Sequence, residues 1–323
     1  MNKLVTIFGG TENLEKYIIY NLANSGYNIN FITQNPEKVG YLKTYGFPGQ
    51  ISITNGDISN YTEVTSFVKI SNIIINCIEI NNEKKKNISF VSTFFPGFLA
   101  ECAMKYNIEK YIHISSISAI LDTESEYGKA KLKGEIEIME KASMKSTIIR
   151  VGHIISNETK YILSICQLAN LPIILIPNRV KVSNVCVSSA VNIAQNICNL
   201  ITDSTTNSKV YNLVNEEINN LEFIKSILLV LNKNPKLIFI SNTISDIKYK
   251  LLQSIPSEFI SHFIQMFNNI GYLNTVKSNS NEKLNNFAEL GIISEKWSDI
   301  VQKVCIGQLN EGIFKNNDIR GYY

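Results

Sequence analysis

The sequence has little of several residue types that mark particular classes of protein. Its 323 residues include only 6 cysteines, 3 histidines and 1 tryptophan, and the net charge is +3. The cysteines form no Cys-x-x-Cys pair and have no histidine spaced as a metal partner, so we expect no metal site. The small charge, with no segment that combines Lys or Arg with aromatic residues, argues against nucleic-acid binding.

Long apolar runs are also missing. The most apolar segment, "YILSICQLANLPIILIP", is interrupted by Gln167, Asn170 and Pro172, so we expect no transmembrane segment. A strand-like segment begins near Lys3, and we therefore expect no signal peptide. The cysteines have apolar neighbours, which is typical of reduced core residues in a cytoplasmic protein. A hydrophobic content of 45% suffices for a substantial core.

Strand-like and helix-like segments alternate from the start of the chain. "LVTIF" and "NINFIT" are strand-like, and between them Leu14, Ile18 and Leu22 share one helical face. "NIIINCIEI" is a nearly continuous apolar run, typical of a parallel strand that is covered on both faces. The alternation continues through "KYIHISSI", "YGKAKLKGEIEIMEKA" and "STIIRVGHII". It predicts an α/β fold with a Rossmann-type, doubly wound parallel sheet.

The rhythm of the sequence changes after about residue 158. We expect residues 1–158 to form the Rossmann domain, with 180–216 returning to its sheet. The remaining segments, 159–179 and 217–323, are expected to form a smaller, mostly helical C-terminal lobe. In that lobe "DIKYKLLQSIPSEFISHFIQMF" has the pattern of an amphipathic helix, which includes His262.

The turn after the first strand, "GGTENLE", departs from a common glycine pattern. A strand that turns through glycines into a helix is typical of dinucleotide-binding folds, which place glycine at three spaced positions. Gly9 fills the first position, but the spacing puts Glu12 and Glu15 at the other two. A carboxylate about 4 Å from a phosphate charge costs about 4 kcal/mol at an effective dielectric near 20. We therefore expect dinucleotide binding to be weak or absent, with Glu12 where a phosphate would lie.

Tyr127 and Lys131 form the second chemical signal. They are four residues apart at the start of a predicted helix, so their side chains point the same way. An ammonium beside a phenol favours the phenolate and lowers the pKa of the tyrosine from about 10 toward neutrality, where it can act as an acid or a base. Tyr106 and Lys110 have the same spacing, but they run from a helix end into a strand and are expected to be structural.

The order of these motifs resembles the extended and atypical short-chain dehydrogenase/reductases, of the NAD-dependent epimerase/dehydratase type. "TIFGGT", "GDIS", "NIIINC", "KYIHISS", "YGKAKLKGE" and "IIRVG" follow one another in that order. "GQISITNGDISN", "EKYIHISSISA" and "AELGIISEKWSDIV" are most similar to the nucleotide-binding accessory subunit of mitochondrial and alphaproteobacterial NADH:ubiquinone oxidoreductase, respiratory complex I. The resemblance spans nearly the whole chain. It implies a Rossmann domain for NAD(P)(H), a small substrate lobe and, in the complex I branch, a nucleotide with a structural role.

The resemblance also implies which residues form the site. The catalytic positions are Tyr127, Lys131 and Ser116. The positions for NADP(H) or NAD(H) are Gly9, Gly10, Thr11, Gln34, Asp57, Ile58, Asn76, Tyr127, Lys131 and Gly152.

The chain departs from the family at three further positions. Gln34 stands where NADP-binding relatives usually have arginine, and Glu79 stands where the family prefers a glycine beside the adenine ribose. Ile117 is best aligned with the usual catalytic hydroxyl. Of the histidines, His113 is expected in the core, and His153 is a hypothetical site-lining residue.

Three functions remain open at this point. The preferred hypothesis is an accessory, non-catalytic subunit of complex I that contacts peripheral-arm subunits, in the cytoplasm or at the cytoplasmic face of the inner membrane. The first alternative is an NAD(P)H-dependent reductase, epimerase or isomerase that uses Tyr127 and Lys131. The second alternative is a nucleotide-sensing binding module, which binds without turnover.

Overall fold

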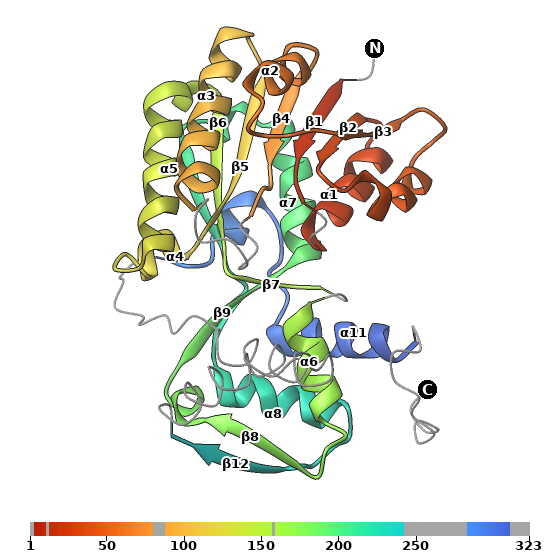
Figure 1. Ribbon diagram of the computed structural model, residues 1–323, viewed down its shortest axis with the longest axis vertical. Coiled ribbons are helices and arrows are strands. Elements are labelled where there is room, and N and C mark those ends of the chain that lie inside the picture. The colour runs from red at the N-terminus through yellow and green to blue at the C-terminus, as the bar shows by residue number, and fades with distance from the viewer. Residues whose placement is uncertain (1–2, 11–12, 80–87, 157–158, 242–282, 311–323) are drawn as a thin grey trace. The chain divides into compact units, whose positions relative to one another are not determined.

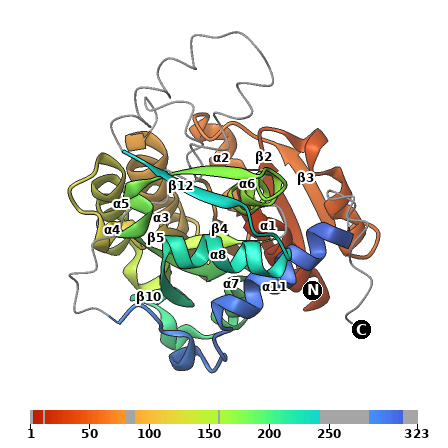
Figure 2. The same cartoon turned by 90° about the horizontal axis from the view of Figure 1, so that it is seen from below.

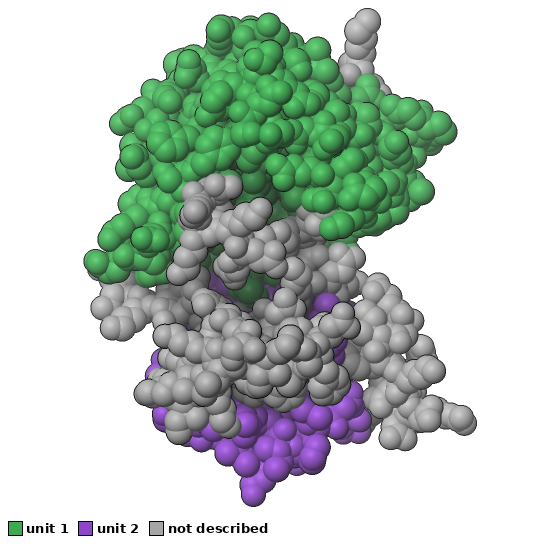
Figure 3. All heavy atoms as spheres, viewed as in Figure 1, with its two compact units in different colours: residues 1–154, 188–214, 278–294 green, residues 155–187, 215–277, 295–323 purple. Residues whose placement is uncertain are grey.

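The computed structural model describes residues 3–10, 13–79, 88–156, 159–241 and 283–310, which Figures 1 and 2 show from two directions. The chain divides into two compact units, coloured separately in Figure 3. Unit 1 consists of residues 1–154, 188–214 and 278–294. Unit 2 consists of residues 155–187, 215–277 and 295–323.

Unit 1 contains a seven-stranded sheet in the order β10-β6-β5-β4-β1-β2-β3, and every pairing in it is parallel. The strand order runs outward from β1 in both directions, which confirms the doubly wound parallel sheet. The strands are β1 (Leu4–Phe8), β2 (Asn28–Thr33), β3 (Ile51–Asn55), β4 (Ile73–Asn76), β5 (Lys110–Ser116), β6 (Ser146–Val151) and β10 (Lys209–Leu213).

Helices cover both faces of this sheet (Figure 1). They are α1 (Asn13–Asn24), α2 (Tyr61–Lys69), α3 (Phe95–Lys105), α4 (Ser118–Leu121), α5 (Glu126–Ala142) and α7 (Ala190–Thr202). In β4, Ile73 and Ile75 pack in one apolar cluster with α1 and α7, whereas Ile74 packs in another with α2, α3 and α5. Burying each such side chain contributes about 1.5–3 kcal/mol, which explains why this strand is apolar at every one of these positions.

A π-helical turn lies directly before α3. Residues Phe90–Phe94 form this turn, and α3 starts directly after it. Such turns are a common cause of a change in helix direction. α5 packs closely against the same turn, because a Cβ on Gly134 would lie 2.0 Å from the carbonyl oxygen of Ser92.

The segment predicted as one strand after α5 is divided in two. β6 ends at Val151, and β7 (His153–Ile155) begins after Gly152. The chain passes from unit 1 to unit 2 within β7 and returns within β9 (Asn184–Ser189).

Unit 2 combines helices with short strand pairs in its described part. β8 (Ile173–Pro177) pairs in parallel with β12 (Lys236–Ile240), and β9 pairs antiparallel with β11 (Glu216–Asn219). The helices are α6 (Lys160–Leu168), α8 (Asn220–Val230) and α11 (Trp297–Asn310), and α8 lies beside α11 in Figures 1 and 2. They surround a core that includes Phe223 and Cys305. The predicted amphipathic helix with His262 lies outside the described residues.

Residues 283–294 belong to unit 1 and not to the small lobe in which the sequence pattern placed them. Phe287 is fully buried in the apolar cluster under α7, where Leu290 and Ile292 also pack. The side chain of Asn286 accepts a hydrogen bond of 2.7 Å from the Asn212 main chain in β10. Apolar packing and this hydrogen bond together join the segment to the core of unit 1.

Candidate functional site

The carboxyl ends of neighbouring parallel strands meet at one edge of the sheet in unit 1. Gly9 and Gly10 follow β1, Glu79 lies shortly after β4, Ser116 ends β5, and Gly152 follows β6. Doubly wound folds bind ligands outside the carboxyl ends of their strands. This edge is therefore the candidate site.

The turn after β1 is closed by a carboxylate from its own helix. Glu15, in the first turn of α1, accepts a 3.0 Å hydrogen bond from the Gly10 main-chain N–H to its Oε1. The residue is only 2% exposed. A Cβ on Gly9 would lie 2.7 Å from the same Oε1 and 2.9 Å from the ring of Phe31. Glycine at position 9 is thus needed to admit the glutamate side chain.

Glu15 is a carboxylate that the structure places against the turn. A main-chain N–H at the start of a helix is an ordinary donor to phosphate, and here a side chain uses it. Glu12 and Thr11 lie outside the described residues. The sequence indicated acidic groups at this turn, and Glu15 is the one of them that lies within the described residues.

Tyr127 and Lys131 lie together, as their spacing predicted, and both bind Glu79. The Tyr127 hydroxyl donates to Oε1 of Glu79 at 3.1 Å, and the Lys131 Nζ donates to Oε2 at 2.8 Å. The Lys131 ammonium lies 5.5 Å from the centre of the Tyr127 ring. Lys131 is 1% exposed and Glu79 is 42% exposed, so the carboxylate covers a buried cation from the solvent side.

The tyrosine at this site is held in its protonated form. Burial raises the pKa of Tyr127 above its ordinary value, and the charge of Glu79 raises it further. Lys131 and Ser116 lower this pKa, but by less. The expectation of a tyrosine pKa near neutrality is wrong, because burial and the charge of Glu79 outweigh the lowering by Lys131.

The lysine stays charged. Burial by itself lowers the pKa of Lys131, but Glu79, Tyr127 and Glu135 together outweigh it, and the pKa lies above its ordinary value. A charged donor and a neutral phenol thus face one carboxylate.

A second buried ion pair lies at the same edge of the sheet. Glu135 of α5 binds Arg150 of β6, with 2.7 Å between Oε2 and Nη2 and 3.0 Å between Oε1 and Nε. The Ser115 hydroxyl donates to the same Oε1 at 2.5 Å. Lys131, Arg150 and Glu135 carry a net charge of about +1, which the Glu79 carboxylate compensates.

Neither Glu135 nor Arg150 was singled out from the sequence. Two signals were available. Glu135 follows Lys131 by one helical turn on α5, and Arg150 is the one charged residue within the apolar strand β6. Charged residues on buried faces need partners, which makes such a pair predictable in kind though not in position.

Asn76, predicted to contact the cofactor, is fully buried and uses its amide inside the protein. Its Nδ2 donates to Nδ1 of His113 at 3.2 Å, and its Oδ1 accepts from the Ile78 N–H at 3.1 Å. Burial lowers the pKa of His113 to about 3, and Lys131 contributes in the same direction. His113 is therefore a neutral core histidine, as predicted.

The other predicted cofactor residues are more scattered. Gln34 is exposed after β2, and Ile58 is half-buried beyond β3. Asp57 is exposed and accepts hydrogen bonds from the N–H and hydroxyl of Ser59, at 2.9 and 2.6 Å, which lower its pKa. The Gly152 N–H donates to the Ser188 hydroxyl at 2.8 Å.

Ser116, the last residue of β5, is the serine beside Tyr127. The Ser116 hydroxyl faces Tyr127 and accepts a 3.2 Å hydrogen bond from the Ser118 N–H. Ile117, at the position best aligned with the usual catalytic hydroxyl, is 3% exposed and belongs to the core. The structure thus places Ser116 beside Tyr127, which binds Glu79 together with Lys131. His153, the hypothetical lining residue, is exposed in β7.

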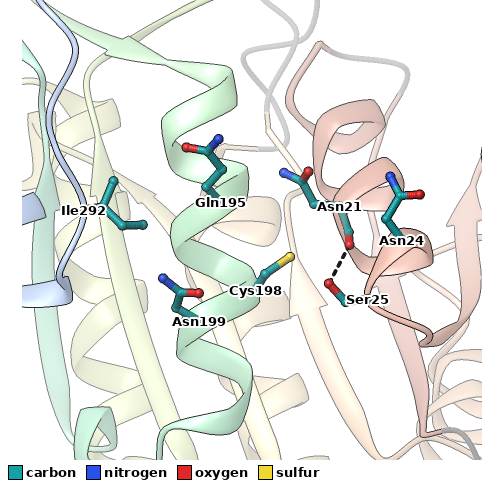
Figure 4. A pocket seen from close by; sticks show the side chains of 7 residues that line it. All are labelled: Asn21, Asn24, Ser25, Gln195, Cys198, Asn199 and Ile292. Atoms are coloured by element: carbon teal, nitrogen blue, oxygen red, sulfur yellow. Dashed lines mark hydrogen bonds between the residues drawn. The ribbon is translucent and has the colours of Figure 1, made fainter.

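A shallow groove of about 400 Å³ lies between α1 and α7 (Figure 4). Carboxamides dominate its wall: Asn21 and Asn24 come from α1, and Gln195 and Asn199 come from α7. Cys198 also lines it, and burial raises the pKa of this thiol to about 11. A protonated thiol is a poor nucleophile, because the thiolate is the reactive form.

The described ranges contain no cluster of His, Cys, Asp and Glu suited to a metal ion. In the same ranges, no helix has the length and apolar character needed to cross a bilayer.

The chain is similar to subunits of a respiratory enzyme. It is 26% identical over 168 residues to the mitochondrial 40 kDa subunit of NADH-ubiquinone oxidoreductase from Neurospora crassa, which covers 51% of this chain and 44% of that protein. It is 25% identical over 219 residues to the mitochondrial NADH dehydrogenase (ubiquinone) 1 alpha subcomplex subunit 9 from Dictyostelium discoideum, covering 67% of this chain and 60% of that protein. The chain is homologous to complex I subunits. It spans about half the length of these curated relatives, and no protein-family model matches it.

Solved structures show which fold this chain has. The Bordetella bronchiseptica enzyme WbmG, in complex with NAD and UDP, has a TM-score of 0.70 at 11% identity, covering 97% of this chain and 96% of that one. A nucleoside-diphosphate-sugar epimerase from Staphylococcus aureus has a TM-score of 0.65 at 14% identity, covering 94% and 100%. The dTDP-glucose 4,6-dehydratase from Bacillus anthracis, in complex with NAD, has a TM-score of 0.63 at 14% identity, covering 74% and 85%. This chain has the Rossmann-type fold of these enzymes.

The described residues of this edge do not fit a bound dinucleotide as they stand. The Gly10 amide is taken by Glu15, and the donors of Lys131 and Tyr127 are taken by Glu79. A phosphate about 4 Å from either carboxylate would meet a repulsion of about 4 kcal/mol at an effective dielectric of 20.

Proposed function

We propose that this chain is an accessory, non-catalytic subunit of NADH:ubiquinone oxidoreductase, built on a short-chain dehydrogenase scaffold. The relatives are named as subunits of that enzyme, which supports the assignment to the complex. One observation carries the non-catalytic part, namely that Glu79 binds both Tyr127 and Lys131.

This contact removes the acid–base chemistry that the pair would supply. A general acid or base works best with a pKa near the operating pH, and the pKa of Tyr127 is raised well away from it. The charge of Lys131 is compensated by Glu79, which weakens its ability to stabilise a phenolate or to bind an anionic ligand. The edge of the sheet is then a structural element of the subunit.

The partners in this proposal are subunits of the peripheral arm of complex I. The protein would be peripheral at the cytoplasmic face of the inner membrane. In this proposal the chain contributes contacts with neighbouring subunits and catalyses no reaction.

Affinity purification from native membranes tests the proposal. The chain carries a tag in the cells that make it, and the membranes are solubilised in a mild detergent. We expect the tagged chain to bring down peripheral-arm subunits and NADH dehydrogenase activity, with an untagged strain as the control. Elution of the chain alone, with the enzyme complex intact in the unbound fraction, would refute the proposal.

A reductase or epimerase is the second candidate, because Tyr127, Lys131 and Ser116 lie together at the edge. This candidate requires turnover of NADPH or NADH by the purified protein and its loss in Tyr127→Phe. Absence of turnover in the wild-type protein, with nucleotide sugars and small carbonyl compounds as probes, would count against it.

A further inference from the structure

We propose that Glu15 and Glu79 are built-in ligands of the dinucleotide site, and that removing both carboxylates turns this chain into a dinucleotide-binding protein. The inference rests on the proposed function in one respect, since both assume an inactive site on a retained scaffold. It goes further by naming the two side chains that fill the site and the ligand class that their removal admits.

Glu15 fills the main-chain half of the site. Its carboxylate accepts from the Gly10 N–H at 3.0 Å and lies in the space that Gly9 leaves by having no Cβ. The negative charge also reaches the adjacent strand end, because Glu15 helps raise the pKa of the buried Cys77 thiol, after burial itself. An anion that approached the Gly10 amide would have to displace this carboxylate.

Glu79 fills the side-chain half. One of its oxygens accepts from the Tyr127 hydroxyl and the other from the Lys131 ammonium, at 3.1 and 2.8 Å. Because the second donor is a buried cation, it requires an anionic partner in every state of the protein. Glu79 is that partner, and it reaches the cation from the exposed side.

The two carboxylates belong to adjacent parts of one edge. β1 and β4 are neighbouring strands, with Phe8 paired to Asn76. Glu15 binds the Gly10 N–H after the end of β1. Glu79, which follows the end of β4, binds Lys131 of α5. Each therefore replaces an interaction that an anionic dinucleotide would make there. Removing Glu15 frees the Gly10 N–H, removing Glu79 frees the donors of Tyr127 and Lys131, and removing both frees all three.

Nucleotide titration of charge-removal variants tests the inference. Glu15→Ala, Glu79→Ala and the double variant are titrated with NADH and with NADPH by calorimetry. Glu222→Ala is the matched control, because Glu222 is also an acidic residue in the first turn of a helix, α8, which belongs to unit 2. We expect no saturation of the wild type or the control below about 1 mM, and a gain of about tenfold for each carboxylate removed.

Two results would overturn the inference. One is binding of either nucleotide to the wild-type protein at micromolar concentration. The other is a folded double variant, judged by circular dichroism, that binds no more tightly than the wild type.

A second measurement covers a double variant that fails to fold. In Glu79→Ala alone, sodium acetate should replace the lost carboxylate between Tyr127 and Lys131 and raise Tm, while sodium chloride at equal ionic strength should not. An equal effect of acetate on the variant and the wild type would contradict the built-in role of Glu79. Co-purification with complex I is measured separately, so failure of the nucleotide titration and failure of the proposed function are distinguishable.

Discussion

Glu79→Gln is the sharpest single perturbation of the candidate site. The substitution keeps the size of the side chain and its ability to accept a hydrogen bond, but removes the charge that faces Lys131. The buried ammonium then loses its solvent-side anion while Glu135 and Arg150 remain paired with each other. We expect the variant to be less stable than the wild type at neutral pH.

The size of the effect follows from the geometry. At the 2.8 Å separation of the two charged atoms, the attraction is about 6 kcal/mol at an effective dielectric of 20 and about 1.5 kcal/mol in water. Glu79 is 42% exposed, so solvent screens the pair and the value lies toward the lower end. We therefore expect a loss of about 2–3 kcal/mol in the free energy of unfolding.

Urea unfolding at pH 7 measures this loss, and a double-mutant cycle with Lys131→Met isolates the pair. Once Lys131 is gone, Glu79→Gln should have little further effect. The phenol absorbance of Tyr127 should also titrate at lower pH in Glu79→Gln, because Glu79 helps raise that pKa. A stability change within about 0.5 kcal/mol, with the same change in the Lys131→Met background, would refute the reasoning.

Three further perturbations test other parts of unit 1. Burial lowers the pKa of His113 to about 3, so unfolding takes up a proton below about pH 6.5. Urea titrations should show that the free energy of unfolding falls by about 2 kcal/mol between about pH 7.5 and pH 5, and that His113→Gln diminishes this fall. The same pH dependence in the variant and the wild type would contradict this. Arg150→Met leaves the Glu135 carboxylate buried without its cation and should lower the free energy of unfolding by about 3–5 kcal/mol. Lys141→Met, at the more exposed Lys141–Glu137 pair on α5, should lower it by less than about 0.5 kcal/mol. Equal losses in the two variants would be inconsistent with the buried pair. Gly134→Ala puts a Cβ 2.0 Å from a main-chain oxygen, so Tm should fall by an amount equivalent to about 1–3 kcal/mol, and an unchanged Tm would show that the close approach is absent.

Much of the fold was predictable because it depends on local periodicity. The apolar run in β4 and the apolar face of α1 indicate how each element is buried, and alternation along the chain indicates a parallel sheet. The pairing of Tyr127 with Lys131 was predictable for the same reason, since one helical turn separates them.

The state of the site was not predictable from those patterns. The sequence placed Glu12 and Glu15 at the glycine turn, but the contact of Glu15 with Gly9 and Gly10 depends on packing. It also predicted a lowered pKa for Tyr127, because nothing local places a carboxylate against that phenol. From the sequence, Glu79 was identified only as a residue at a position where the family prefers glycine.

The sequence by itself determined the strand–turn–helix at the start of the chain, the doubly wound sheet, and the tyrosine and lysine on one turn of α5. Only the tertiary structure decided that Glu79 binds this pair, from 48 and 52 positions away in the chain. The order of β4 and β5 in the sheet brings these segments together, and strand order depends on how the two apolar faces are covered. Local spacing therefore specifies which donors exist at the edge, and long-range packing specifies what they bind.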